Sequence, residues 1–170
     1  MTAATITLRP AGDDDTAFFA ALYASTREEE LAPTPMTREQ KDAFLAQQFA
    51  AQTAHYARSR AGAAFDVVLV DGERAGRLIV DEQGDGEIGI VDISLLPAHR
   101  GHGVGTRLLA PILERAEALG RPVGIHVERF NPARRLYERL GFAVVDGDGV
   151  YDKMVWSPSG AARDQPKTAS

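Results

Sequence analysis

The stretch that most constrains the fold runs from Val91 to Gly120, where an apolar run, a glycine-rich loop and an amphipathic segment follow one another. The apolar run is long enough for a buried strand, and Pro97 ends it because proline cannot donate to a sheet ladder. The amphipathic segment predicts a helix that Gly120 ends and that Pro111 should kink. Glycines let a ligand approach the backbone, and a helix start presents unpaired N–H groups, so the stretch predicts an anion-binding site.

The spacing of the glycines excludes two familiar phosphate-binding patterns. The dinucleotide fingerprint G-x-G-x-x-G would need a glycine where this chain has Thr106. A P-loop would need G-K-[ST] after its second glycine, and no such triplet follows Gly105. The loop instead resembles the pyrophosphate loop of the GNAT superfamily of N-acetyltransferases, whose pattern Q/R-x-x-G-x-G/A corresponds here to Arg100-Gly101-His102-Gly103-Val104-Gly105.

A second motif of the same superfamily lies between Val127 and Phe142. Its pattern is N-x-x-A/x-x-x-L-Y-x-x-x-G-F, and Asn131 and Tyr137 stand at the required separation. The superfamily often has alanine at the position of Arg134. Because both motifs occur in the right order, the chain is identified by resemblance as a member of the GNAT superfamily.

The resemblance implies acetyl-CoA as the cosubstrate. In relatives the glycine loop and the following helix start hold the pyrophosphate, and the asparagine of the second motif meets the pantetheine arm. A backbone N–H near the end of the preceding strand stabilises the oxyanion that forms on the thioester carbonyl. Carried onto this sequence, the candidate cofactor-binding residues are Ser94, Leu95, Leu96, Arg100, Gly101, His102, Gly103, Val104, Gly105, Thr106, Asn131 and Arg134.

The resemblance also implies a general acid. The departing CoA thiolate needs a proton, and in relatives the tyrosine at the position of Tyr137 lies near the thioester sulfur, where a phenol can donate it. The alternative is that Tyr137 only packs its helix on the sheet, because most helical tyrosines bury the ring and leave the hydroxyl wet.

The general base is less well defined, because the glutamate that many relatives carry on the fourth strand corresponds here to Gly89. A protonated amine must lose a proton before it attacks, usually to a carboxylate or through water. Asp92 is the favoured catalytic candidate, since it lies on the same strand between apolar residues. Glu87, His126 and Glu128 stay open as alternatives, and Asp92 could instead make a local structural pair.

Three consecutive carboxylates, Glu28 to Glu30, are expected to end the first helix. In the superfamily the loop between the first two helices lines the acceptor side, so Glu28 and Glu29 are candidate substrate-binding residues for a cationic amine. A solvated helix end is the alternative. The four histidines lack metal-site spacing, and no metal is expected.

Hydrophobic periodicity and turn signals predict the order β-α-α-β-β-β-α-β-α-β-β between Thr5 and Trp156. The segment Asp13–Thr16 is expected to cap the first helix, and Thr37 with Gln40 predicts a capping box for the second. The helix between the fourth and fifth strands predicts a right-handed crossover and a parallel strand pair. The order is that of the GNAT fold, of the α/β (α+β) class, with a mixed central sheet of about six to seven strands and about four helices.

With 170 residues, the chain is expected to form a single domain, residues 1–156, followed by a tail, 157–170, whose small, polar and proline-bearing composition predicts disorder. The net charge of −5 disfavours nucleic-acid binding, and the absence of cysteine excludes disulfides and a thiol nucleophile. No apolar run approaches the length of a membrane span, and the N-terminus lacks a signal-peptide pattern. A cytoplasmic monomer or homodimer without a membrane partner is therefore expected.

The function that the resemblance to the GNAT superfamily implies is transfer of the acetyl group of acetyl-CoA to a primary amine of a small molecule or peptide, by direct attack in a ternary complex. The alternative is a non-catalytic acyl-CoA-binding or regulatory module that kept the loop and lost the chemistry. Gly89 favours the module, and Tyr137 favours the enzyme. Acetylation of a protein N-terminus stays open, whereas the acidic balance disfavours an amine carried by tRNA.

Overall fold

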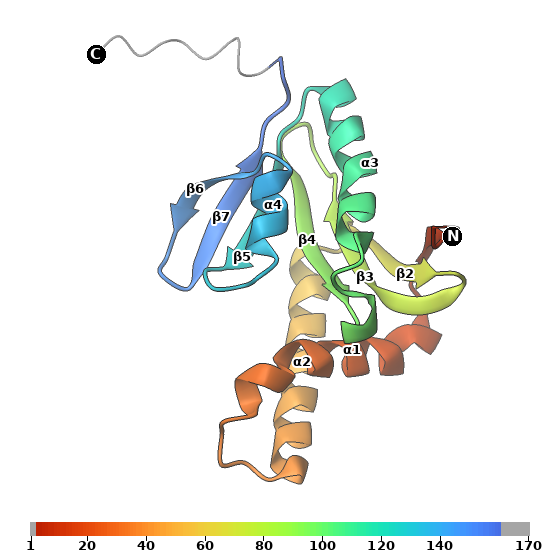
Figure 1. Cartoon of the computed structure of the whole chain (residues 1–170), viewed down its shortest axis with the longest axis vertical. Helices are drawn as coiled ribbons and strands as arrows, with labels where there is room; N and C mark the ends of the chain where they lie inside the picture. The colour runs from red at the N-terminus through yellow and green to blue at the C-terminus, as the bar shows by residue number, and fades with distance from the viewer. Residues whose placement is uncertain (1–2, 161–170) are drawn as a thin grey trace. The chain divides into compact units, whose positions relative to one another are not determined.

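The computed structural model describes residues 3–160, and within that range it confirms the predicted order of strands and helices (Figure 1). Two short 3-10 helices, η1 and η2, precede α1 and the glycine loop. The elements are β1 (Ile6–Pro10), η1 (Asp13–Asp15), α1 (Thr16–Leu31), α2 (Arg38–Ser59), β2 (Ala64–Val70), β3 (Glu73–Asp81), β4 (Ile88–Leu95), η2 (Pro97–His99), α3 (Val104–Leu119), β5 (Val123–Glu128), α4 (Arg134–Arg139), β6 (Ala143–Gly147) and β7 (Tyr151–Trp156).

The strands form one mixed sheet in the order β1-β2-β3-β4-β5-β7-β6. β1 pairs with β2 antiparallel, and β7 pairs antiparallel with both β5 and β6. β4 and β5 are parallel, with Ile88, Gly89 and Ile90 opposite Val123, Gly124 and Ile125, which confirms the expected parallel pair. A parallel pair needs a long connection, and α3 supplies it.

The described residues group into two compact units whose boundary passes through β3 and β4. The first unit contains the residues up to Ile79 and the segment Asp92–His102, and the second contains Val80–Val91 and the residues from Gly103 onward. The expectation of a single domain over residues 1–156 stays a prediction.

In the first unit, α1 and α2 pack against each other through aromatic side chains. Leu22 and Tyr23 of α1 are buried, and the ring centroid of Tyr23 lies 5.9 Å from that of Phe49 on α2. The predicted capping box of α2 is confirmed, because Thr37 Oγ1 accepts from the Gln40 N–H and Gln40 Oε1 accepts from the Thr37 N–H. The sequence thus predicted the start of α2 from local chemistry alone.

The start of α1 differs from the prediction, because no side chain caps it. Asp15, which is only 1% exposed, instead accepts two hydrogen bonds of 2.8 Å from the Arg9 guanidinium and one of 2.9 Å from the Gly12 N–H. The hydrogen bond from Arg9, followed by that from Gly12, holds the pKa of Asp15 well below its usual range. Asp15 therefore joins β1 to the start of η1 rather than capping α1.

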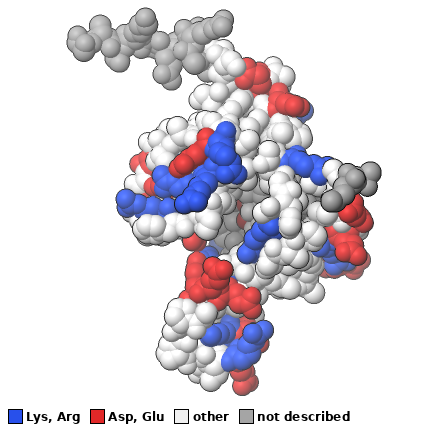
Figure 2. All heavy atoms as spheres, viewed as in Figure 1, with Lys and Arg blue, Asp and Glu red and all other residues white. Residues whose placement is uncertain are grey.

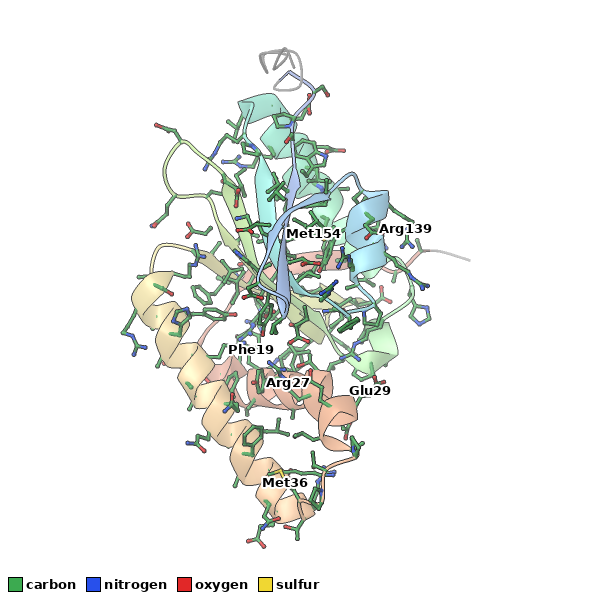
Figure 3. The ribbon with its side chains drawn as sticks, turned by 90° about the vertical axis from the view of Figure 1, so that its left-hand side faces the viewer. Phe19, Arg27, Glu29, Met36, Arg139 and Met154 are labelled. Carbon is green, nitrogen blue, oxygen red and sulfur yellow. The ribbon has the colours of Figure 1, made fainter. Side chains whose placement is uncertain are left out.

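In the second unit, the core forms between the sheet and α3. Met154 of β7 is fully buried, while Arg139 of α4 is exposed (Figure 3). α3 begins after Gly103 (φ 79°), ends at Gly120 (φ 66°) as predicted, and continues through Pro111. Its buried face consists of Val104, Leu108, Leu109 and Ala116.

Asn131-Pro132 predicts the start of a short helix that ends at Gly141, because proline suits the first turn of a helix. α4 is shorter, Arg134–Arg139, because the chain makes a turn before the helix begins. Asn131 Oδ1 accepts from the Ala133 N–H at 2.9 Å, which closes an Asx turn over Pro132. The predicted disorder of the tail falls largely on residues 161–170, which lie outside the described residues. Just before them, the Ser159 N–H donates to both carboxylate oxygens of Glu117.

Candidate functional site

The glycine loop is held by hydrogen bonds to its own chain and by left-handed glycines. Gly101 has a φ of 77° and Gly103 a φ of 79°, a region that side chains with a Cβ rarely adopt. A Cβ built on either residue would meet no atom of residues 3–160 within 4 Å, so packing against this part of the chain does not require either glycine. The Arg100 Nε donates to the Leu95 carbonyl at 2.9 Å, and this bond ties the loop to the end of β4. The sequence alone indicated only a phosphate contact for Arg100.

The start of α3 leaves several backbone donors without helical partners. The helical bond from the Arg107 N–H reaches the carbonyl of Gly103, at 3.1 Å. The N–H groups of Val104, Gly105 and Thr106 therefore have no partner within the helix. Because the N-cap is a glycine, no side chain caps them either. Together with the positive end of the helix dipole, these donors fit an anionic group such as a phosphate.

Gly105 has a packing role that the sequence did not reveal. A Cβ at this position would lie 2.8 Å from Leu136 Cδ2, on α4 of the same unit. The third glycine of the loop therefore lets α3 and α4 approach each other closely. The contact joins the two sequence motifs, which lie about one helix and one strand apart in the chain.

The second motif places two of its polar residues, Asn131 and Arg134, in different surroundings. Asn131 is exposed, with its side-chain oxygen used in the Asx turn. Arg134 donates to Glu138 at 3.1 Å, to the Arg129 carbonyl at 3.3 Å and to Asp152 on β7. The hydrogen bond to Glu138, aided by Asp152, raises the pKa of Arg134 despite its partial desolvation. Arg134 thus ties α4 to β7, and its predicted role in cofactor binding stays a prediction.

A basic hollow lies around the turn before α4. Figure 2 shows Lys and Arg side chains gathered over this part of the second unit. Phe130, at the edge of the hollow, is 91% exposed. A flat apolar ring beside several guanidinium groups is a surface that suits an anionic ligand with an aromatic group. The hollow is lined by Arg129, Phe130, Asn131, Pro132, Arg134, Arg135 and Glu138.

Tyr137 is only 4% exposed, and its ring packs edge-on against Phe142 at a centroid distance of 5.9 Å. Tyr137 therefore has a packing contact, as the alternative interpretation of the sequence expects. A buried ring and a catalytic hydroxyl are compatible, because a phenol can pack its body and direct its oxygen elsewhere. The role of Tyr137 as general acid stays a prediction.

Asp92 lies in the first unit and is hydrogen-bonded through both oxygens. Its Oδ2 accepts from the Arg77 Nε at 2.8 Å, and its Oδ1 accepts from the Ser94 Oγ at 2.9 Å. The local pairing that was weighed against a base role is therefore present, and the base role stays a prediction. Leu96, a predicted cofactor residue that directly follows β4, donates its N–H to the Ala75 carbonyl on β3.

The other candidate bases lie in the second unit. Glu87 pairs with Lys153 Nζ at 2.5 Å, and its carboxylate occupies the space that a Cβ on Gly124 would need. His126 is exposed on β5, and Glu128, the last residue of that strand, is half-buried. Glu87 thus has a structural partner, as Asp92 does.

The backbone of β4 supplies the candidate oxyanion donors. Its ladder with β5 covers Ile88 to Ile90. β4 itself continues to Leu95, so Ser94 and Leu95 lie beyond the ladder with β5, whereas the other edge of β4 pairs with β3. A backbone N–H that points to the β5 edge of this end of β4 is outside the ladder with β5, and such a donor is the kind that can bind a ligand oxygen.

The carboxylates that end α1 are exposed, as the sequence indicated. Figure 3 shows Glu29 and Arg27 on this helix, and Arg27 pairs with Glu30 at 3.0 Å. The last turn of α1 contains no basic residue. Carboxylates at the negative end of a helix dipole are electrostatically unfavourable, so Glu28 and Glu29 do not stabilise the helix by their charge.

Two further findings concern metals and membranes. Among residues 3–160, no group of three or more His, Asp or Glu side chains could hold a metal ion. No helix in the described part of the chain is both long and apolar enough to cross a membrane.

Comparison with known proteins gives one family and one fold. The family model of the Acetyltransferase (GNAT) family matches residues 19–142. Among curated proteins, none matches the sequence significantly.

Solved structures share the fold at low sequence identity. PaiA N-acetyltransferase from Thermoplasma acidophilum, in complex with coenzyme A, superimposes with a TM-score of 0.69 at 16% identity, covering 90% of this chain and 99% of that one. An acetyltransferase from Thermus thermophilus gives a TM-score of 0.64 at 19% identity, covering 90% and 97%. A GNAT family acetyltransferase from Elizabethkingia anophelis with acetyl-CoA bound gives 0.58 at 14% identity, covering 89% and 97%.

Proposed function

The chain belongs to the Acetyltransferase (GNAT) family, and we propose that it transfers the acetyl group of acetyl-CoA to a primary amine of a small molecule or peptide. The observation that carries this proposal is the start of α3. There Gly103 adopts a left-handed conformation in open space, and the following N–H groups lack helical partners. This arrangement supports a pyrophosphate site, because phosphate oxygens accept hydrogen bonds from such donors.

The reaction requires two proton transfers and one bond exchange. The amine nitrogen attacks the thioester carbonyl carbon, a C–N bond forms, and the C–S bond breaks to release the CoA thiolate. The proton lost by the amine goes to a general base, and the thiolate gains one from a general acid. We assign the acid role to Tyr137 and the base role to Asp92, and the oxyanion donor to the backbone N–H of Ser94 or Leu95.

The basic hollow supports binding of an anionic cosubstrate from another direction. Asn131 and Arg134 line it, and both belong to the second motif. Arginine forks suit phosphate oxygens, and an exposed ring such as Phe130 can stack on a flat group. For the acceptor, the exposed carboxylates Glu28 and Glu29 suit a cationic amine.

A second function is favoured by specific observations. Gly89 stands where relatives carry a glutamate, and Asp92 is already paired with Arg77. A chain without an available base would bind acyl-CoA and transfer nothing, as a regulatory module does.

A thiol-release assay separates these two functions. The protein is incubated with acetyl-CoA and a panel of primary amines, and free thiol is followed with a chromogenic reagent. The chain itself has no cysteine, so every thiol that appears comes from CoA. Amine-dependent release supports the enzyme, whereas calorimetric binding of acetyl-CoA without release supports the module.

A further inference from the structure

Arg77 on β3 is a buried charge to which the proposed mechanism gives no role. It is 7% exposed and lies in the first unit. Its guanidinium donates through Nε to Asp92 and through Nη2 to Gln52 Oε1 on α2, at 2.8 and 2.9 Å. The guanidinium carbon also lies 5.4 Å from the ring centroid of Phe19 and 5.9 Å from that of Tyr56. Helices α1 and α2 and strand β4 therefore all contact one side chain.

Burying a guanidinium is costly, and replacing a buried ion pair by apolar residues is often neutral or stabilising. The rings of Phe19 and Tyr56 offset part of this cost through cation–π attraction. The Arg77–Asp92 ion pair is therefore not well explained by a contribution to the stability of the fold. The Arg77–Asp92 pair is better explained by a need for fixed geometry. A guanidinium that is hydrogen-bonded to two different side chains leaves few orientations to the carboxylate that accepts from it.

The acceptor in question is the Asp92 carboxylate. Arg77 holds one of its oxygens, and Ser94 Oγ donates to the other. The backbone of β3 also packs closely against the same part of β4. A Cβ on Gly76 would lie 2.1 Å from the Ser94 carbonyl oxygen, so only glycine allows this approach. The orientation of the Asp92 carboxylate and the position of Ser94 are therefore fixed together.

We propose that Arg77 is a positioning residue for acyl transfer, which holds Asp92 and Ser94 in their working geometry and is itself oriented by Gln52. This inference rests on the proposed function and adds to it a residue outside both sequence motifs. Arg77 touches neither the cosubstrate nor the amine in this proposal, and it acts through the Asp92 carboxylate.

The test is a double-mutant cycle in turnover number. Asp92→Asn, Arg77→Met and the double variant are compared with the parent, using acetyl-CoA and the best amine of the panel. Asp92→Asn should lower kcat about a hundredfold, and Arg77→Met about tenfold or more. The KM for acetyl-CoA should stay within about twofold of the parent. Because Arg77 acts through Asp92, the double variant should be no slower than Asp92→Asn alone.

Matched variants separate positioning from folding. Arg74→Met changes another β3 arginine, which pairs with Asp15 at 3.5 Å and lies 5.9 Å from the Phe18 ring, and it should leave kcat unchanged. Arg77→Lys keeps the charge without the fork and should recover part of the kcat lost in Arg77→Met. Gln52→Leu removes only the outer hydrogen bond and should lower kcat by a smaller factor, which keeps the test valid if Arg77→Met does not fold.

The outcomes distinguish this inference from the proposed function. Multiplied losses in the double variant, or full activity of both Arg77→Met and Gln52→Leu, overturn the positioning role while acetyl transfer stands. An effect of Arg77→Met without any effect of Asp92→Asn overturns it as well. A parent that releases no thiol with any amine overturns the proposed function, and the role of Arg77 with it.

Discussion

At the scale of single residues, Tyr137 makes the sharpest prediction, because one oxygen atom separates its catalytic role from its packing role. Tyr137→Phe keeps the ring and its contact with Phe142. We expect single-turnover thiol release to slow about a hundredfold or more, since a general acid contributes at least that much. Acetyl-CoA affinity should be unchanged, and the free energy of unfolding should fall by no more than about 1.5 kcal/mol, the value of one hydrogen bond. Release within about twofold of the parent, with chemistry limiting the rate, would assign Tyr137 to packing alone.

Asp15 gives a prediction about stability and pH. Its pKa is lowered in the folded state by the Arg9 hydrogen bond, so the ionised carboxylate stabilises the fold. The advantage of the parent over Asp15→Asn in denaturant midpoint should be complete at pH 7. It should begin to shrink below about pH 4, the ordinary value of an aspartate, and vanish as the pH falls toward the lowered pKa. Asp14→Asn, at an exposed neighbour, is the control. An advantage that stays constant down to about pH 2 would show that the ion pair does not account for it.

The side-chain hydrogen-bond partners within the site could not be predicted from the sequence. Arg77 pairs with Asp92 across 15 positions and with Gln52 across 25. Nothing in the local pattern of a strand arginine names such distant partners. The glycines and the Asn131–Tyr137 spacing were readable, because each follows from a motif whose residues are close together in the chain. The structure placed these residues, and their chemical roles stay predictions.

At the scale of elements, the glycine loop and α3 make a prediction with a matched control. Gly103 and Gly84 both have positive φ values, 79° and 75°, and both have open space where a Cβ would lie. Substituting valine at either position should therefore cost similar backbone strain, about 1 to 2 kcal/mol. Only Gly103→Val should weaken acetyl-CoA binding, about tenfold or more in a calorimetric titration, because its side chain stands where phosphate oxygens approach. Equal affinities of the two variants would place the pyrophosphate elsewhere.

Most elements followed from periodicity and turn chemistry, and the exceptions have local causes. Thr37 and Gln40 define the start of α2, and Gly120 the end of α3, because each cap uses neighbouring residues. The start of α4 that Asn131-Pro132 predicts is too early, because the Asn131 side chain closes a turn and the helix begins only at Arg134. The predicted cap of α1 was wrong, because the Asp15 carboxylate accepts hydrogen bonds from Arg9 on β1 instead of from the first turn of α1.

At the scale of the whole molecule, binding of the cosubstrate should raise stability. A ligand that binds only the folded state adds about 2.7 kcal/mol at roughly a hundred times its dissociation constant. Acetyl-CoA and CoA should therefore raise the melting temperature progressively as their concentration increases, whereas free acetate should not. Absence of a shift with saturating acetyl-CoA would remove the basis for an acyl-CoA site of either kind.

Acetyl transfer by this chain is best tested by measuring amine-dependent release of thiol from acetyl-CoA together with mass spectrometry of the amine. We expect CoA thiol and acetylated amine to appear in equal amounts, neither of them to appear without the amine, and Tyr137→Phe to slow both alike. Binding of acetyl-CoA with no thiol release across the whole amine panel would contradict this expectation and would identify the chain as a non-catalytic acyl-CoA-binding member of its family.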